Sequence, residues 1–419
     1  MPDCRRGLAS TRSVVGEETS HVRRTAGLGL AACARLFCVA CPLASIGLLA
    51  GCSGNLPDLA SSPSAPQQPT THIGEGKVKA GLILPLSASG NAAVAAQSMR
   101  NAAEMALAEF NNPDLQLLVK DDGGNAPGAQ QAAQQALDEG AEIILGPLFA
   151  LTVGPVGQAA RARGVPVIAF STDTNVAARG VYLLSFLPEA DVERIIGYAA
   201  TQGRRSFAAL VPDNAYGTVA EAAFKQAVGR AGGRVIALER YPLDRAQMQT
   251  PVRNIAQAAS RADAIFVPDG TDAVPTVVQT LTANGIDTKR VQLLGTGLWE
   301  DAQIFSNPLL DGAWYAGPDS TGFRNFSARY RSRYGKDPVR TASLAYDAVA
   351  LVAALVKTQG RQRFSDDVLT NSSGFTGIDG LFRFRPDGTN QRGLAVLKVS
   401  PTGGQIISPP PKGFGGSAT

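Results

Sequence analysis

The sequence predicts an α/β protein with two parallel sheets, and two observations support this fold class. The chain has 419 residues, 44% of them hydrophobic, which is enough for two domains with separate cores. Short apolar runs alternate along the chain with Ala-rich amphipathic segments, as they do in repeated βαβ units. Such units place parallel strands in a sheet that carries helices on both faces.

The first series of alternating elements spans residues 77–186. Its predicted strands are short apolar runs that end at a proline, a glycine or a polar turn, and its predicted helices are rich in Ala, Gln and Glu. The strands are Lys77–Leu86, Leu115–Lys120, Glu142–Gly146, Val165–Phe170 and Val181–Phe186, and the helices are Asn91–Phe110, Gln130–Glu139 and Val156–Arg163.

A second series of the same kind follows in residues 191–295, so the chain contains enough elements for two sheets. Its predicted helices are Asp191–Gln202, Thr218–Ala231, Val252–Ser260 and Ala273–Asn284, and its predicted strands are Ser206–Pro212, Arg234–Tyr241, Ala264–Pro268 and Val291–Gly295.

The N-terminal region has the pattern of a targeting segment. Arginines precede Leu36–Ala50, which is uncharged and mostly apolar but shorter than the roughly 20 residues of a membrane span. The sequence Leu49–Cys52 resembles the bacterial lipobox, in which the cysteine is lipidated and becomes the first mature residue. We therefore expect residues 1–51 to be a lipoprotein signal peptide and Cys52 to be the lipid anchor. An uncleaved anchor and a plain secretory signal are the alternatives.

Two segments have the composition of flexible chain. Residues 52–76 are rich in Ser, Pro, Gln and Gly, which predicts a lipidated cysteine followed by a tether, with His72 as a solvated residue. Residues 400–419 include a proline run and several glycines, and they predict a disordered tail.

The composition limits the possible chemistry. All five cysteines lie at or before Cys52, and the two histidines, His21 and His72, lie outside the predicted α/β region. Zinc sites of Cys and His, Ser-His-Asp triads and Cys-His pairs therefore cannot be built there. We expect no enzyme, no cofactor and no metal, although carboxylate chemistry and oxygen-only metal ligation stay open. Most of the net charge of +4 comes from arginines before Cys52, so nucleic-acid binding is not expected.

The segment Asp121–Gly124 is compatible with a metal loop, a phosphate loop or a turn. An EF-hand loop needs a carboxylate at its twelfth position, which here is Ala132 or Ala133. A phosphate loop needs Gly-Lys-Ser/Thr, which is absent. The segment follows a predicted strand and precedes a helix, so it lies at the edge where open α/β sheets bind ligands. Its aspartates are expected to form turns and helix caps.

Six motifs carry a resemblance to a known family. They lie in "LILPLSASGNAAVAAQSMRNAAEMAL", "DDGGNAPGAQQAAQQAL", "IILGP", "VPDNAYGTVAEAAFKQAV", "FSARYRSRYGKDPVRTASLAYDAVAL" and "GFTGIDGLFRFRPDGTNQRGLAVLKV". In this order they resemble the type I periplasmic binding proteins, the relatives of the leucine/isoleucine/valine-binding protein. The resemblance extends over Lys77–Val399.

The resemblance implies two Rossmann-like lobes, each with a parallel central sheet, joined by a hinge of three chain crossings near Phe186–Glu189, Ala316–Asp319 and Asn371–Gly380. Lobe one would comprise residues 77–187 and 319–370, and lobe two residues 188–318 and 371–399. It also implies a non-enzymatic envelope lipoprotein that binds a small polar, amino-acid-like solute in an inter-lobe cleft. Such a protein is the substrate-binding component of an ABC-type transporter, and hinge closure would bury the solute.

An alternative function comes from one branch of the same family. The sequences "ILPLS…QSMRNAAEMAL" and "VQLLGTGLW" resemble the lipoproteins called penicillin-binding protein activators. This resemblance implies regulation of peptidoglycan synthesis through contact with a cell-wall synthase rather than an ABC permease. Both readings place the protein on the periplasmic side of the envelope, anchored to the membrane at Cys52.

Candidate ligand-binding residues are the polar groups in the loops that follow strands. They are Ser87, Ser89, Thr152, Ser171, Thr172 and Thr174 in lobe one, and Tyr216, Asp269, Gly270, Thr296 and Trp299 in lobe two. The alternative roles are helix capping for the hydroxyls, packing under the hinge for Tyr216 and a core position for Trp299.

Amino-acid-binding relatives often carry an acidic residue after the strand that matches "VQLLG", where it pairs with the ligand ammonium. Here Thr296, Gly297 and Leu298 follow that strand. Asp173 and Asp269 are the expected substitutes. The departure puts a free amino acid in doubt, and the glycines would leave room for a bulkier ligand.

Overall fold

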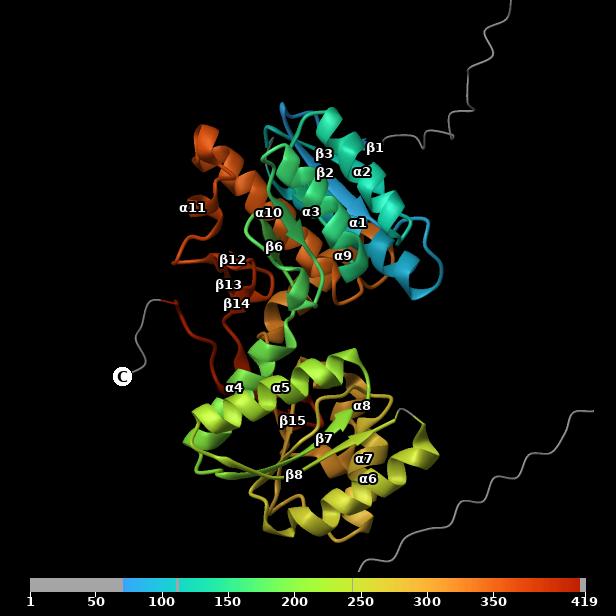
Figure 1. The fold of residues 1–419 in the computed structure, drawn as a ribbon, viewed down its shortest axis with the longest axis vertical. Coiled ribbons are helices and arrows are strands. Elements are labelled where there is room, and N and C mark those ends of the chain that lie inside the picture. Colours follow the sequence, from blue (N-terminus) through green and yellow to red (C-terminus); the bar gives the residue numbers. More distant parts are fainter. Residues whose placement is uncertain (1–70, 111–112, 243, 415–419) are drawn as a thin grey trace, which may run out of the picture. The chain divides into compact units, whose positions relative to one another are not determined.

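A computed structural model of the chain describes residues 71–110, 113–242 and 244–414 (Figure 1). The predicted signal peptide, the lipidation site Cys52 and all but the end of the predicted tether lie outside these ranges. Within them, the mixed α/β fold with two lobes is confirmed, and each lobe has a sheet dominated by parallel strands. None of the described helices is both long and apolar enough to span a membrane.

The first sheet has six strands in the order β1-β3-β2-β4-β5-β6. All neighbours are parallel except β1, which pairs antiparallel with β3. The strands are β1 (Thr71–Ile73), β2 (Val78–Leu84), β3 (Leu115–Asp121), β4 (Ala141–Leu145), β5 (Val167–Ala169) and β6 (Val181–Leu183), and the helices between them are α1 (Asn91–Glu109), α2 (Ala126–Asp138) and α3 (Ala150–Ala162).

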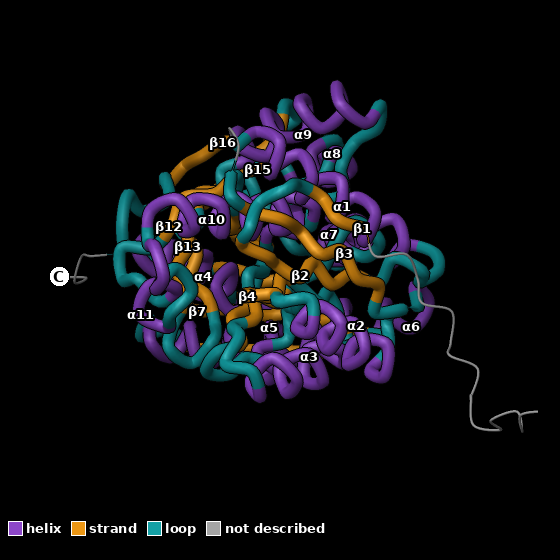
Figure 2. Tube along the Cα trace, turned by 90° about the horizontal axis from the view of Figure 1, so that it is seen from above, coloured by secondary structure: helices purple, strands orange, loops and turns teal. Residues whose placement is uncertain are grey.

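Helices bury both faces of this sheet. Alternate residues of β2, such as Leu82 and Leu84, pack with α1 and α10 (Ala342–Thr358) in one core cluster. The intervening Ile83 packs with residues of α2 and α3 in another. Figure 2 shows α1 on one side of β2 and α2 and α3 on the other. Because side chains alternate across a strand, a continuous apolar run is what a strand covered on both sides requires.

The second sheet has seven strands in the order β16-β15-β11-β10-β9-β7-β8. Its central strands are parallel, and β15 pairs antiparallel with both β11 and β16. The strands are β7 (Ser206–Pro212), β8 (Arg234–Tyr241), β9 (Ala264–Phe266), β10 (Gln292–Gly295), β11 (Trp314–Gly317), β15 (Ala395–Ser400) and β16 (Gly403–Ser408).

The helices of the second lobe also lie on both faces of their sheet. One core cluster joins the sheet to α4 (Pro188–Thr201) and α5 (Ala215–Arg230). The other joins it to α6 (Arg245–Ala258), α7 (Val274–Ala283) and α8 (Ala302–Phe305). All predicted elements of both series are present, but helices α3 and α6 begin six and seven residues earlier than expected, at Ala150 and Arg245.

A third sheet changes the expected division of the chain. It consists of β12 (Phe375–Gly377), β13 (Gly380–Phe384) and β14 (Asn390–Arg392), which pair antiparallel. Its buried Phe382 and Phe384 belong to the core cluster of the first sheet. The third crossing therefore lies at Gly393–Leu394, between β14 and β15, and not at Asn371–Gly380. The aromatic residues of these strands are what hold them to lobe one.

The remaining α-helices, α9 and α11, also lie with the first lobe. Helix α9 (Ser320–Tyr334) packs Phe326 and Tyr330 against α1, and α11 (Asp366–Leu369) buries Leu369 in the first core. The chain leaves the first sheet after β6 and returns between β11 and α9, close to the first two expected crossings.

Two segments expected to be flexible form strands. Residues 71–73 of the expected tether form β1, and the exposed His72 lies 3.4 Å from a carboxylate oxygen of Glu139. Residues 403–408 of the expected tail form β16, paired with β15. Both strands complete the edge of a sheet, where backbone pairing decides the structure more than side-chain composition does.

We predict that Gly295→Ala destabilises the second lobe. A Cβ at Gly295 would lie 2.1 Å from Cδ2 of Trp299, whose side chain is fully buried. The free energy of unfolding should fall by about 1–3 kcal/mol, the usual cost of overpacking, in urea denaturation. The control is Gly197→Ala in α4, where a Cβ meets nothing within 4 Å and helix propensity should keep or raise stability. Equal stability of the two variants would contradict the prediction.

Candidate ligand-binding site

The order of the strands identifies where each sheet can hold a ligand. In the first sheet β3 lies on one side of β2 and β4 on the other, and in the second sheet β8 and β9 flank β7 in the same way. In the first sheet the loops after β2 and β4 lead to helices on opposite faces, and in the second sheet the loops after β7 and β9 do the same. In open α/β sheets, ligands bind at the carboxyl edge between two such loops. Some candidate residues follow these strands, namely Ser87 and Ser89 after β2, Thr152 after β4, Tyr216 after β7 and Asp269 and Gly270 after β9, whereas the others follow the next strands, β5 and β10.

At the end of β2, Ser87 is exposed and joined to the Asp121 turn. The amides of Ser87 and Gly123 donate to Oδ1 of Asp121 at 3.2 and 2.9 Å. Burial acts to raise the pKa of Asp121, but the hydrogen bonds from Ser87 and Gly123 outweigh it and hold the pKa below its usual value. Ser89 is exposed in the same loop. The predicted turn role of Asp121 is confirmed.

The neighbouring Asp122 is fully buried. Its Oδ1 accepts from the amide of Gly124 at 2.8 Å, while Oδ2 has no hydrogen-bond partner among the described residues. Burial raises the pKa of this carboxyl group. Thr152, also buried, donates to the carbonyl of Phe149 at 2.8 Å in the first turn of α3. Thr152 is therefore buried inside the lobe and bonded to its own helix, although it does not cap α3, which has no side-chain cap hydrogen bond.

The loop after β5 combines a buried and an exposed part. Oγ of the buried Ser171 accepts from the amide of Asp173 at 3.1 Å, and Asp173 caps the short helix η1 (Thr174–Val176) through the amide of Asn175. Thr172 is exposed. Thr174 donates to Oε1 of Glu189 at 3.0 Å, across the first crossing. Asp173 is thus occupied by a cap, which disfavours it as the substitute acid.

In the second lobe, the structure brings Tyr216 and Thr296 together. Their hydroxyl oxygens lie 2.9 Å apart, with Tyr216 in the first turn of α5 and the buried Thr296 directly after β10. Burial raises the pKa of the Tyr216 phenol, and the carboxylates of Asp191, Asp269 and Glu189 add to this increase. The tyrosine therefore keeps its proton and remains available as a hydrogen-bond donor.

The structure gives Asp269, Gly270 and Trp299 different positions. Asp269 accepts from the phenol of Tyr241 and from the amide of Gly270, both at 2.7 Å. Trp299 is fully buried in the core of the second lobe, in the short helix η3 (Gly297–Trp299). The proposed role of Trp299 as a ligand contact does not fit this position, because its indole packs beneath Gly295.

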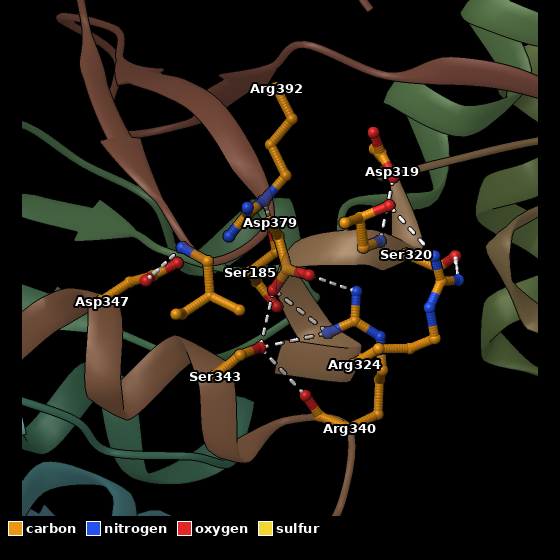
Figure 3. A network of polar contacts seen from close by, with 11 residues as sticks. Ser185, Asp319, Ser320, Arg324, Arg340, Ser343, Asp347, Asp379 and Arg392 are labelled. Carbon is orange, nitrogen blue, oxygen red and sulfur yellow. Dashed lines mark hydrogen bonds and ion pairs between the residues drawn. The ribbon is translucent and has the colours of Figure 1, made fainter. Parts of the chain in front are cut away.

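A charged cluster lies near the crossings, where the sequence singled out no ligand contact (Figure 3). Arg340 donates to Asp379 through two nitrogens, at 3.0 and 2.5 Å, and Ser343 donates to the same carboxylate at 2.6 Å. Arg392 donates to the carbonyl of Ser185 at 2.9 Å. The guanidinium carbons of Arg340 and Arg392 lie 4.5 and 4.7 Å from the ring centre of Phe186.

This cluster is connected to the second lobe by Asp191. Oδ2 of Asp191, in α4, accepts from the amide of Gly297 at 2.9 Å. Burial raises the pKa of Asp191 to about 7, against the lowering effect of the Gly297 amide, Arg392 and Arg340. A carboxyl group thus lies beside the loop after β10, although the acid is absent from the loop itself. Sequence reasoning did not identify Asp191 as this acid, because Asp191 and Gly297 are far apart in the chain and meet only in the folded structure.

Apolar side chains are exposed beside the same strand ends. Val94, Leu151 and Leu298 are 58%, 59% and 47% exposed, and they follow β2, β4 and β10 in the helices α1, α3 and η3. Each carboxyl edge therefore offers hydroxyls, amides and an apolar contact, which suits a small ligand with a polar and an apolar part. Among the described residues there is no group of three or more acidic, His or Cys side chains placed to bind a metal.

Comparison with known proteins identifies the class. The sequence profile of the family described as periplasmic binding protein matches residues 77–405, and the chain belongs to this family. The Leu/Ile/Val-binding protein homolog 6 of Brucella melitensis is 25% identical over 232 residues. That alignment covers 52% of this chain and 58% of the relative, so the similarity extends over little more than half of each protein.

Solved structures share the fold at low sequence identity. A putative branched-chain amino acid ABC transporter protein from Rhodospirillum rubrum is 21% identical with a TM-score of 0.71, covering 79% of this chain and 99% of that one. An ABC transporter substrate-binding protein from Desulfitobacterium hafniense, in complex with Leu, is 18% identical with a TM-score of 0.60, covering 79% and 99%. Together with the family match, these structures support a type I periplasmic binding protein.

We predict that Asp347→Asn reduces the pH dependence of stability. Burial raises the pKa of Asp347 to about 7, the charge of Asp379 adds to the increase, and the amide of Ile378 opposes it. Because the folded-state pKa lies above the unfolded value near 3.9, this group stabilises the fold fully below about pH 4. That contribution is lost as the pH rises to about 7. Between pH 4 and pH 7 the free energy of unfolding of the wild type should therefore fall by up to about 4 kcal/mol more than that of the variant, since one pKa unit corresponds to about 1.4 kcal/mol; urea denaturation measures both.

The matched control for Asp347→Asn is Asp311→Asn, which removes an exposed carboxylate. It should leave the slope of stability against pH unchanged. A slope equal to wild type in Asp347→Asn would show that this carboxyl group titrates normally.

Proposed function

We propose that this protein is a non-enzymatic, lipid-anchored solute-binding component of an ABC-type transporter. Its ligand would be a small, amino-acid-like molecule held between the carboxyl edges of the two sheets. The single observation that carries the proposal is the placement of hydroxyl groups, amides and exposed apolar side chains at the carboxyl ends of the strands in both sheets. Membership of the periplasmic binding protein family and the ABC-type relatives support it.

In this proposal each lobe supplies a different part of the contact. Lobe one supplies Ser87, Ser89, Ser171 and Thr172 with the amino end of α3, where backbone N–H groups favour a carboxylate. Lobe two supplies Tyr216 and the backbone of Gly270. Asp191 would take the role of the acid that amino-acid-binding relatives carry in the loop after β10, because it accepts a hydrogen bond from Gly297 of that loop.

A ligand that meets both lobes would stabilise the closed arrangement. Two polar edges that lose water on closure need a matching donor or acceptor from the ligand, because each unmatched buried group costs about 1–3 kcal/mol. The ligand therefore provides the free energy that favours closure, and the closed form is the one that a permease would recognise.

The alternative is regulation of a cell-wall synthase, as in penicillin-binding protein activators. One observation favours it: Thr296 and Gly297 are engaged with Tyr216 and Asp191, and the exposed Leu298 beside them offers an apolar contact to a protein. This alternative predicts that the purified protein retains a cell-wall synthase in a pull-down and binds no amino acid.

We predict that a ligand of the transport class raises the melting temperature. Leucine, isoleucine, valine, dipeptides and muropeptides should be screened by thermal shift, since a ligand at 100 times its Kd adds about 2.7 kcal/mol. For the ligand found, Tyr216→Phe should weaken binding by about 2- to 10-fold in calorimetry, the value of one hydrogen bond. The control is Tyr334→Phe, which also removes one tyrosine hydroxyl. That hydroxyl donates to the carbonyl of Asn101, and neither residue belongs to the candidate site. No shift with any compound would refute the transport proposal.

We also predict that Cys52 carries the lipid. Cys52→Ser should abolish incorporation of labelled palmitate and release the protein from the membrane fraction, because acyl chains supply the anchoring energy. Cys41→Ser, a change inside the same apolar segment, should leave both measurements as in wild type. Lipid incorporation that persists in Cys52→Ser would exclude this residue as the anchor.

A further inference from the structure

The C-terminal segment connects the two lobes a fourth time. After β16 ends at Ser408 in the second sheet, residues 409–414 run to the third sheet, which is packed on the core of lobe one. We call residues 409–414 the C-terminal strap. In Figure 1 this segment lies beside the crossings, near β14 and α4.

The beginning of the strap is fixed to lobe two by Arg194 of α4. One nitrogen of its guanidinium donates to Oγ of Ser408 at 2.7 Å and to the carbonyl of Pro409 at 3.2 Å. Nε donates to the carbonyl of Leu394, in the third crossing, at 2.8 Å. A single planar cation therefore joins α4, the third crossing and the first residue of the strap.

The end of the strap is fixed to lobe one by Phe414. The guanidinium carbon of Arg383 in β13 lies 4.7 Å from the ring centre of Phe414, which is a cation–π contact. The ring also covers Gly374, because a Cβ placed there would lie 2.9 Å from Cε2 of Phe414. Between the two ends, Pro411 lies against Gly393, where a Cβ would be 3.4 Å from its Cγ.

The composition of the strap makes it stiff. Pro409, Pro410 and Pro411 are consecutive, and such a run favours the extended polyproline conformation, with a rise of about 3.1 Å per residue. A cavity of about 630 Å³ lies between the strap and the crossings, lined by Leu187, Glu189, Arg392 and two prolines of the strap among others. The strap is thus held mainly at its ends and spans a space beside the segments that act as the hinge.

We propose that the C-terminal strap limits rotation of the two lobes about the hinge. A stiff segment fixed to both lobes keeps the distance between Arg194 and Phe414 within narrow bounds. The three crossings can bend as the lobes rotate, so they restrain the rotation less than the strap does. This restraint is separate from the proposed function, because it acts whether or not the cleft holds a ligand.

The test measures the distance between the lobes in the absence of ligand. Spin labels at Gln158→Cys in α3 and Gln226→Cys in α5, both exposed positions, report on lobe one and lobe two by double electron–electron resonance. The full chain is used with serine in place of its native cysteines, which are Cys4, Cys33, Cys38, Cys41 and Cys52.

Deletion of residues 409–419 should broaden the distance distribution or move its mean by more than about 2 Å, the scale of a domain rearrangement. Phe414→Ala should change it in the same direction, and it carries the test if the deletion variant does not fold. Deletion of residues 415–419 is the matched control and should leave the distribution unchanged. Distributions identical to the full chain in Phe414→Ala and in a folded 409–419 deletion would overturn the proposal, whatever the ligand screen shows.

Discussion

The structure depends on one constraint, which is that both central sheets are buried on both faces. Leu82 and Ile83, adjacent in β2, enter opposite cores, and the second sheet is covered in the same way. Such a sheet leaves no surface for function except its edges and the ends of its strands. The polar candidate residues lie at the strand ends for this reason, and substitutions within the strands affect stability rather than binding.

The segments that join the lobes are built from charge and aromatic rings rather than from apolar packing alone. Phe186 lies close to two guanidinium groups, and the carboxyl groups of Asp191, Asp347 and Asp379 surround them. Two nitrogens of Arg392 have no hydrogen-bond partner among the described residues. One carboxylate oxygen of Asp347 also has none among them. Buried charged groups are costly unless paired, and for Arg392 the neighbouring carboxyl groups and the ring of Phe186 supply opposite or polarisable partners.

The candidate site differs from the expected one in how its acid is supplied. The loop after β10 contains no carboxylate, but the amide of Gly297 contacts Asp191 of α4. Asp173 and Asp269, the substitutes expected from sequence, are engaged by Asn175 and by Tyr241. A carboxyl group from helix α4 therefore lies beside a loop that contains no acid of its own, and its position depends on how α4 is held.

The sequence by itself determined the fold class, the order of strands and helices and the residue types at the strand ends, because hydrophobic periodicity and turn residues are local properties. Only the tertiary structure decided the roles of Trp299 and Thr152, which pack inside their lobes, and the location of the third crossing. Strands β1 and β16 have linker-like composition and form only because a sheet edge offers unpaired backbone groups. The contact of Asp191 with Gly297 and the position of Phe414 on Gly374 join residues that are distant in the chain, so no local pattern records them.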